Sequence, residues 1–243
     1  MFFDKYPEFV DLDIRNSRPN LTITVESLSN RCEAIFSKLN LEGSSILDLG
    51  SALGAMGHYA LVNGAKSYTG VEIQKPYRDT SATLLAKYHQ NWNIVSSIKE
   101  IDSTYDIVLA CGIVHSFIDI FGILKKVCSL SSSVVIIETN NPKLMDSPMI
   151  AFTKDAPMVS TKDVPIPRYS GLAALPNKGA VDLIMLLNSF VEECRIYPKP
   201  ILGSIDGYNN PNVPQHRFIS KYVKTEHIVP TLESTIYDDN MDF

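Results

Sequence analysis

The sequence predicts a doubly wound α/β fold built on one largely parallel sheet. Short apolar runs alternate with helical patterns between residues 45 and 223, and this alternation is typical of a parallel sheet covered by helices on both faces. Most of the runs are five or six residues long and lack polar alternation, as expected for strands buried on both faces. The chain has 243 residues, of which 45% are hydrophobic and 20% are charged, so one folded domain with its own core is expected.

Each strand is expected where an apolar run meets a glycine, proline or polar turn, and each helix where apolar residues recur every three or four positions. Residues 1–44 form an N-terminal extension, which is polar and irregular up to residue 24 and helical after it. In chain order, the strands are expected over residues 45–49, 68–72, 92–95, 105–110, 134–138, 193–197 and 217–223. The helices are expected over residues 25–39, 55–62, 77–89, 117–128 and 180–190. Asn63-Gly64 should end the second of these helices as a C-terminal cap.

Two long segments interrupt the pattern after the fifth and sixth strands. Residues 139–178 contain six prolines and little periodicity, and residues 198–215 are rich in proline, glycine and asparagine. Loops that follow parallel strands lie at the carboxyl edge of the sheet, where ligands bind, and long irregular loops in compact domains are usually functional. We therefore expect both segments to face the substrate. The candidate contacts to the substrate are Arg168, Tyr169, Tyr208, Asn209 and Asn210.

The most informative motif follows the first strand. Residues 45–57 read Ser-Ile-Leu-Asp-Leu-Gly-Ser-Ala-Leu-Gly-Ala-Met-Gly, with Asp48, Gly50 and Gly54 in the spacing Asp-x-Gly-x-x-x-Gly. Gly50 permits a tight turn and the close approach of a ligand to the backbone. The helix that begins after Gly54 offers backbone N–H donors and a partial positive potential. Glu72 ends the second strand 24 positions after Asp48, and a carboxylate there can accept both hydroxyls of a ribose.

This arrangement resembles motif I of the class I S-adenosylmethionine (SAM)-dependent methyltransferases. The resemblance is clear over residues 25–138 and extends to residue 223 by strand order. It implies a Rossmann-like, seven-stranded, mostly parallel sheet with an antiparallel last strand, a SAM-binding domain over residues 45–223 and transfer of a methyl group from SAM. The residues that it assigns to the cofactor are Asp48, Gly50, Ser51, Ala52, Gly54, Glu72, Ile73, Ser97, Ile98, Ala110, Cys111 and Gly112. Within this set, Glu72 would bind the ribose and Ile73 the adenine.

Several of these residues also have simpler interpretations. Asp48 could cap a helix, and Glu72 could be a solvated strand end. Cys111 could be a nucleophile, but it lacks the Pro-Cys context of the cytosine methyltransferases. The favoured interpretation is that Cys111 is only a small residue beside the SAM sulfur. His115 follows the fourth strand and is the candidate catalytic residue, because histidine transfers protons near neutrality, although it could only pack. Arg31, on the N-terminal helix, is expected to be a surface charge.

The motifs do not name the methyl acceptor, but they disfavour some classes. Position 52 is alanine, where the dinucleotide fingerprint needs glycine, so a nucleotide-dependent oxidoreductase is disfavoured. No Asp-Pro-Pro-Tyr follows the fourth strand, which disfavours amino-methylation of DNA. The Lys-Asp-Lys-Glu set of RNA 2′-O-methyltransferases cannot be assembled, because Asp106 opens the fourth strand and Glu138 ends the fifth without a lysine. A small-molecule acceptor is therefore expected, with a catalytically silent SAM-binding subunit or an RNA methyltransferase as alternatives.

Charge and cysteine usage bound the partners and the compartment. The net charge of -5 and the acidic tail over residues 224–243 disfavour a broad nucleic-acid surface. The four cysteines lie far apart without a Cys-x-x-Cys pair, which indicates reduced thiols in a cytoplasmic setting and no metal site. No apolar run approaches 18 residues, so no membrane span is expected.

Overall fold

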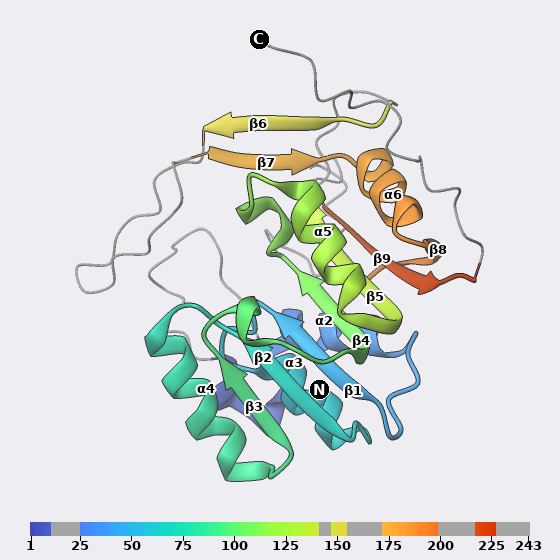
Figure 1. Cartoon of the computed structure of the whole chain (residues 1–243). Coiled ribbons are helices and arrows are strands. Elements are labelled where there is room, and N and C mark those ends of the chain that lie inside the picture. The colour runs from blue at the N-terminus through green and yellow to red at the C-terminus, as the bar shows by residue number, and fades with distance from the viewer. Residues whose placement is uncertain (11–24, 141–146, 155–171, 199–216, 227–243) are drawn as a thin grey trace.

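The fold is a three-layer α/β sandwich around a seven-stranded sheet with the order β3-β2-β1-β4-β5-β9-β8 (Figure 1). The computed structural model describes residues 1–10, 25–140, 147–154, 172–198 and 217–226. The strands of the sheet are β1 (Ser45–Leu49), β2 (Ser67–Val71), β3 (Trp92–Val95), β4 (Tyr105–Cys111), β5 (Ser131–Asn140), β8 (Phe190–Ile196) and β9 (Arg217–Lys224). Strands β1 to β5 pair in parallel, whereas β9 is antiparallel to both β5 and β8. The predicted Rossmann-like topology, with its antiparallel last strand, is confirmed.

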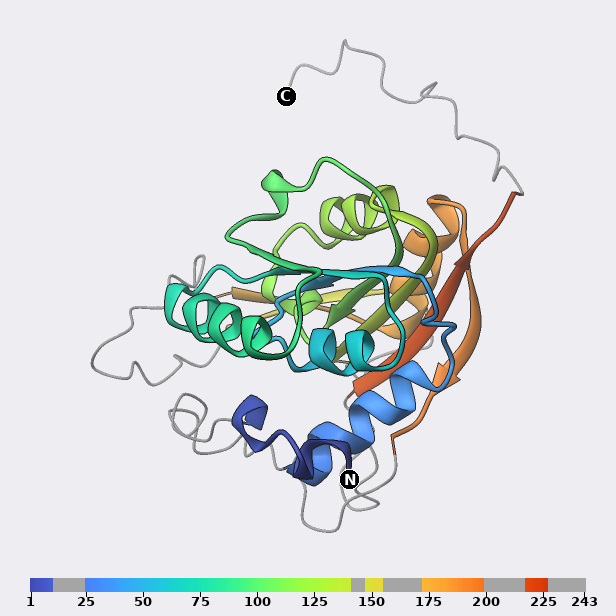
Figure 2. The ribbon, with the colours of Figure 1, turned by 90° about the horizontal axis from the view of Figure 1, so that it is seen from below.

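Helices cover both faces of the sheet (Figure 2). The helices are α2 (Val25–Phe36), α3 (Ala55–Val62), α4 (Lys75–Tyr88), α5 (Ile120–Ser129) and α6 (Lys178–Leu187). The 3-10 turns are η1 (Phe2–Asp4), η2 (Pro7–Val10), η3 (Ile98–Glu100) and η4 (Val114–Ser116). One face carries α5 and α6, and the other carries α2, α3, α4 and the N-terminal turns. Within the described stretches, no helix has the length and apolar character needed to cross a bilayer.

Side-chain alternation along the strands gives each face its own core. Val108 and Ala110 of β4 belong to the cluster under α5 and α6, whereas Ile107, Leu109 and Cys111 belong to the cluster under α2 and α3. Fully burying an aliphatic side chain contributes roughly 1.5–3 kcal/mol to stability, so these two layers hold the sheet in place. Successive strand residues point to opposite faces, and the same alternation therefore decides which strand-end residues can meet at the carboxyl edge.

Two expectations about irregular segments are wrong in part. Residues 139–178 are not wholly irregular, because β6 (Ile150–Lys154) and β7 (Leu172–Pro176) pair as an antiparallel ribbon outside the main sheet. The lead-in is also partly ordered, since Phe3 and Phe9 of the N-terminal turns are 0% and 1% exposed. The described parts of both segments are too short to show a detectable periodicity, and they pack against residues distant in sequence. The fifth strand is longer than predicted, because the serine triplet at 131–133 joins it.

Candidate cofactor site

The loop between β1 and α3 is tied down by β2. The backbone N–H groups of Gly50 and Ser51 both donate to the carbonyl oxygen of Val71, at 2.8 and 3.1 Å. Gly50 and Gly54 have φ angles of +75° and +77°, in the left-handed region that glycine adopts without strain. The predicted roles of both glycines in shaping this turn agree with this geometry. A Cβ atom on Gly50 would lie 2.7 Å from the Ile113 side chain and one on Gly54 would lie 3.1 Å from Leu85, so both positions need glycine for the turn and for its packing at the carboxyl edge of the sheet.

Glu72 joins this loop to the one that follows β2. Its Oε2 atom accepts a hydrogen bond from the Ala52 N–H at 3.0 Å, and its Oε1 atom accepts one from the Gln74 N–H at 2.8 Å. The residue is 6% exposed, so it is not a solvated strand end. A carboxylate can accept about four hydrogen bonds, so the same group can serve both loops and the hydroxyls of a ribose. The arrangement fits the nucleoside part of SAM.

Asp48 is a buried carboxylate on the same face of the sheet. It is 3% exposed and accepts a hydrogen bond from the Tyr68 hydroxyl at 3.0 Å. Burial raises the pKa of Asp48 to about 6, although the Tyr68 hydrogen bond and the charge of Arg31 act in the opposite direction. The N-cap of α3 is Gly54, so the simpler interpretation of Asp48 as a helix cap is wrong. A desolvated carboxylate beside a glycine loop favours a positively charged group as its partner, and the ammonium group of SAM is one.

The buried charge of Asp48 leads to a testable pH dependence. The folded state holds a proton on Asp48 between about pH 4 and pH 6, where the unfolded chain has lost it, so this residue lowers stability as pH rises through that window. Asp48→Asn should therefore raise the free energy of unfolding at neutral pH, by roughly 1–3 kcal/mol, and should weaken SAM binding. Urea titrations and calorimetry at acidic and neutral pH measure both effects. Asp102→Asn is the control, because Asp102 is exposed. If Asp48→Asn is less stable than wild type at neutral pH, the raised pKa of Asp48 is contradicted.

The predicted residues at the end of β4 divide between the two faces. Cys111 lies on the Asp48 face, and burial raises the pKa of its thiol well above the usual value, so the thiol stays protonated and is a poor nucleophile. Ala110 faces the opposite core, and only its backbone can serve the site. Gly112 has a φ angle of +74° and donates its N–H to the carbonyl oxygen of Glu138 at 2.9 Å. His115 lies just beyond, in η4, which packs against β5, β7 and α5.

The remaining predicted residues have mixed outcomes. Ile73 is 59% exposed beside Glu72, and an adenine ring could cover it. The Ser97 side chain accepts the N–H of Lys99 at 3.2 Å and caps η3, so it has a local structural role. Ile98 packs against the core under α5. The five candidate substrate contacts lie outside the described residues: Arg168, Tyr169, Tyr208, Asn209 and Asn210.

The sequence interpretation missed an ion pair beside this site. Arg31 of α2 donates from Nε to the Oε2 atom of Glu138 at 2.8 Å, and its Nη2 group donates to the same oxygen. Glu138 is completely buried and pairs in register with Cys111. The expectation that Arg31 is a surface charge is therefore wrong. A signal was present, because Arg31 lies three residues after Leu28 and four before Ile35, on the apolar stripe of its helix.

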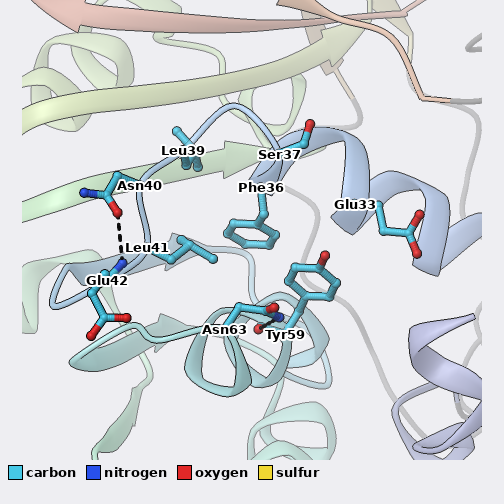
Figure 3. Close-up of a pocket in the computed structure, with 9 residues that line it drawn as sticks. All are labelled: Glu33, Phe36, Ser37, Leu39, Asn40, Leu41, Glu42, Tyr59 and Asn63. Atoms are coloured by element: carbon cyan, nitrogen blue, oxygen red, sulfur yellow. Dashed lines mark hydrogen bonds between the residues drawn. The ribbon is translucent and has the colours of Figure 1, made fainter.

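A hollow of about 450 Å³ lies at the other end of the molecule (Figure 3). It is formed by the end of α2, the turn before β1 and the end of α3. The residues that line it are Glu33, Phe36, Ser37, Leu39, Asn40, Leu41, Glu42, Tyr59 and Asn63. Because β1 begins at Ser45 and ends at Leu49, this hollow is on the amino-terminal side of the sheet, away from Gly50, Gly54 and Glu72. It contains none of the predicted site residues.

Among the described residues, no group of three or more His, Cys, Asp or Glu side chains could hold a metal ion.

The order of the seven strands and the antiparallel β9 define the class of fold. The chain has the fold of the class I SAM-dependent methyltransferases. No protein-family model and no curated protein matches its sequence, so the comparison rests on solved structures. Structures that match across most of the chain include complexes with SAM or with S-adenosylhomocysteine (SAH).

Three of these structures illustrate the similarity. The Burkholderia thailandensis 1,6-didemethyltoxoflavin N1-methyltransferase matches 92% of this chain and 90% of its own, with a TM-score of 0.62 and 15% identity. The magnesium protoporphyrin IX methyltransferase of Synechocystis PCC 6803 matches 92% and 94%, with a TM-score of 0.59 and 13% identity. A SAM-dependent methyltransferase from Mesorhizobium loti matches 81% and 100%, with a TM-score of 0.59 and 15% identity. At these identities the comparison establishes the fold alone.

Proposed function

We propose that this protein binds SAM and transfers its methyl group to a small-molecule acceptor. The observation that carries the proposal is Glu72, whose two carboxylate oxygens hold the Ala52 and Gln74 amides at the carboxyl edge of a methyltransferase fold. Asp48 would face the ammonium group of SAM, and Gly112 would present backbone beside the methionine part. SAM, when bound, supplies a methyl group on a positively charged sulfonium.

In such a reaction the protein mainly aligns the methyl donor with the acceptor and excludes water. The glycine turns at Gly50, Gly54 and Gly112, with φ angles of +75°, +77° and +74°, set the path of the backbone that would hold the donor. A base is needed only when the acceptor must lose a proton. His115 is the candidate for that role because it follows Gly112 closely, on a turn that packs against β5 and β7.

A small-molecule acceptor is supported by two features. The net charge of -5 offers no general attraction for a polyanion, which disfavours RNA. The Burkholderia and Synechocystis proteins are named as methyltransferases of 1,6-didemethyltoxoflavin and of magnesium protoporphyrin IX, both of which are small molecules.

The proposal is tested in two stages. Calorimetry with SAM, SAH and NAD(P) comes first, and binding of NAD(P) with no binding of SAM or SAH would overturn the proposal. Labelled SAM is then incubated with the protein and a small-molecule extract of its source, and methylated products are separated from RNA. Transfer into small molecules supports the enzyme, whereas binding without any transfer supports the silent SAM-binding subunit. Repeating the transfer assay with His115→Gln tests whether this residue takes the acceptor proton.

The two long segments that follow β5 and β8 give a further expectation about the acceptor. We propose that residues 139–178 and 198–215 face the acceptor, as their positions after β5 and β8 suggest. Shortening residues 203–212 to a brief glycine linker should lower acceptor turnover by about tenfold or more while leaving the Kd for SAM unchanged. Steady-state kinetics with calorimetry measure both quantities. Unchanged turnover would remove this loop from the acceptor site.

A further inference from the structure

The first ten residues, here called the N-terminal clasp, surround a buried histidine with aromatic rings. His58, in the first turn of α3, is completely buried. The ring of Phe9 stacks on it at 4.4 Å between centroids with an interplanar angle of 19°. Tyr6 meets the same imidazole edge-on at 4.2 Å. The clasp therefore packs against the folded domain through these rings. Figure 2 shows it beside α2, on the face of the sheet that carries α3 and α4.

The clasp also holds the end of helix α4. Glu8 accepts hydrogen bonds from the Tyr88 hydroxyl and from Lys87 Nζ, the latter at 2.9 Å. His89 Nε2 lies 2.8 Å from His58 Nδ1, so one of these two nitrogens donates to the other. The ring of Tyr6 lies 5.4 Å from that of Tyr88. Through these contacts the first ten residues bridge α3 and the end of α4, two helices that lie more than 40 positions further along the chain.

Both of the bridged helix turns contact Gly54, in the loop between β1 and α3 that is here called the cofactor loop. On the α3 side, the His58 N–H donates to the Gly54 carbonyl oxygen at 2.9 Å. On the α4 side, Leu85 packs so closely that a Cβ atom on Gly54 would lie 3.1 Å from its Cδ1 atom. The His89 N–H donates to the carbonyl oxygen of that same Leu85 at 2.8 Å. Gly54 thus lies between two helix turns that the clasp holds together.

We infer that the N-terminal clasp positions the cofactor loop, so that docking of the clasp on α3 and α4 is coupled to the binding of SAM. This inference rests on the proposed function, because it concerns the same loop. Coupling between two sites is reciprocal: if the docked clasp favours SAM, bound SAM must favour the docked clasp by the same factor. The residues with this positioning role are Tyr6, Glu8 and Phe9, with His58, Tyr88 and His89 as their partners.

Reciprocity supplies a test that a merely structural clasp would fail. Hydrogen–deuterium exchange of the wild-type chain is measured with and without saturating SAH, and the amides of residues 2–10 should exchange more slowly in its presence. Phe9→Ala, which removes the stacked ring, should raise the Kd for SAH by about tenfold. Phe121→Ala is the matched control, because this phenylalanine is 47% exposed on α5, on the opposite face of the sheet.

A second variant covers the case in which Phe9→Ala fails to fold. Tyr88→Phe removes only the hydroxyl that donates to Glu8, and the Kd for SAH should rise by about threefold. Suppose that SAH binds, that the clasp amides exchange as fast as in the SAH-free protein, and that Tyr88→Phe has the wild-type Kd. The coupling is then overturned and the proposed function stands. If wild-type protein binds neither SAH nor SAM, the proposed function falls and the coupling falls with it.

Discussion

Replacing Glu72 by alanine is expected to weaken SAM binding by about 1–3 kcal/mol, which is roughly 5- to 150-fold in Kd. The substitution removes the proposed partner of the ribose hydroxyls. It also frees the amides of Ala52 and Gln74, which the two carboxylate oxygens now hold at 3.0 and 2.8 Å. The ligand contact and the positions of two loops are lost together, and this is why a large effect is expected from one buried side chain.

Calorimetric titration with SAM and SAH measures the effect, and thermal unfolding of the free protein runs beside it. Glu42→Ala is the matched control, since Glu42 lies in the hollow on the amino-terminal side of the sheet. The contrary outcome is a Glu72 variant that unfolds at a lower temperature and still binds SAM with the wild-type Kd, so that neither the carboxylate nor the loop positions that it fixes matter for binding. Such a result would remove Glu72 from the cofactor site.

Local pattern was sufficient to predict the part of the fold that carries the site. The bounds of β1, α3 and β3 agree with the structure at both ends, because each is a regular run closed by a turn residue. Gly50 and Gly54 were predicted to shape the loop, and both have positive φ angles. The strand-end position of Glu72 follows from the parallel register, in which Leu49 of β1 aligns with Val71 of β2.

The features that sequence reasoning missed all depend on contacts between distant residues. The partner of Arg31 is Glu138, 107 positions away, and no local pattern connects them. The aromatic residues of the clasp have no visible period of their own, and their order comes from packing against α2, α3 and the end of α4. The ribbon strands β6 and β7 are short segments 17 residues apart, so neither identifies its partner.

The ion pair between Arg31 and Glu138 should give the largest effect on stability. Arg31→Met removes the counter-ion of a carboxylate that is completely buried at the end of β5. Breaking a buried pair from one side typically costs about 3–5 kcal/mol, because the remaining charge keeps its desolvation penalty. The loss should appear in urea unfolding as a lower midpoint with an unchanged slope. Glu138→Leu should cost less, since the Arg31 side chain is 20% exposed and can turn toward water.

The double variant Arg31→Met with Glu138→Leu separates the two sources of that loss. It removes both charges and fills their space with apolar groups, so it should regain most of the stability that Arg31→Met loses, in keeping with buried pairs replaced elsewhere. If the double variant is as unstable as Arg31→Met, the loss reflects packing of α2 and not an isolated charge. Glu138 aligns with Cys111, and the carbonyl oxygen of Glu138 accepts the Gly112 N–H. The Kd of the double variant for SAH therefore tests a second role of the ion pair. A raised Kd means that the pair shapes the cofactor site, and a wild-type Kd means that it only fastens α2 to the sheet.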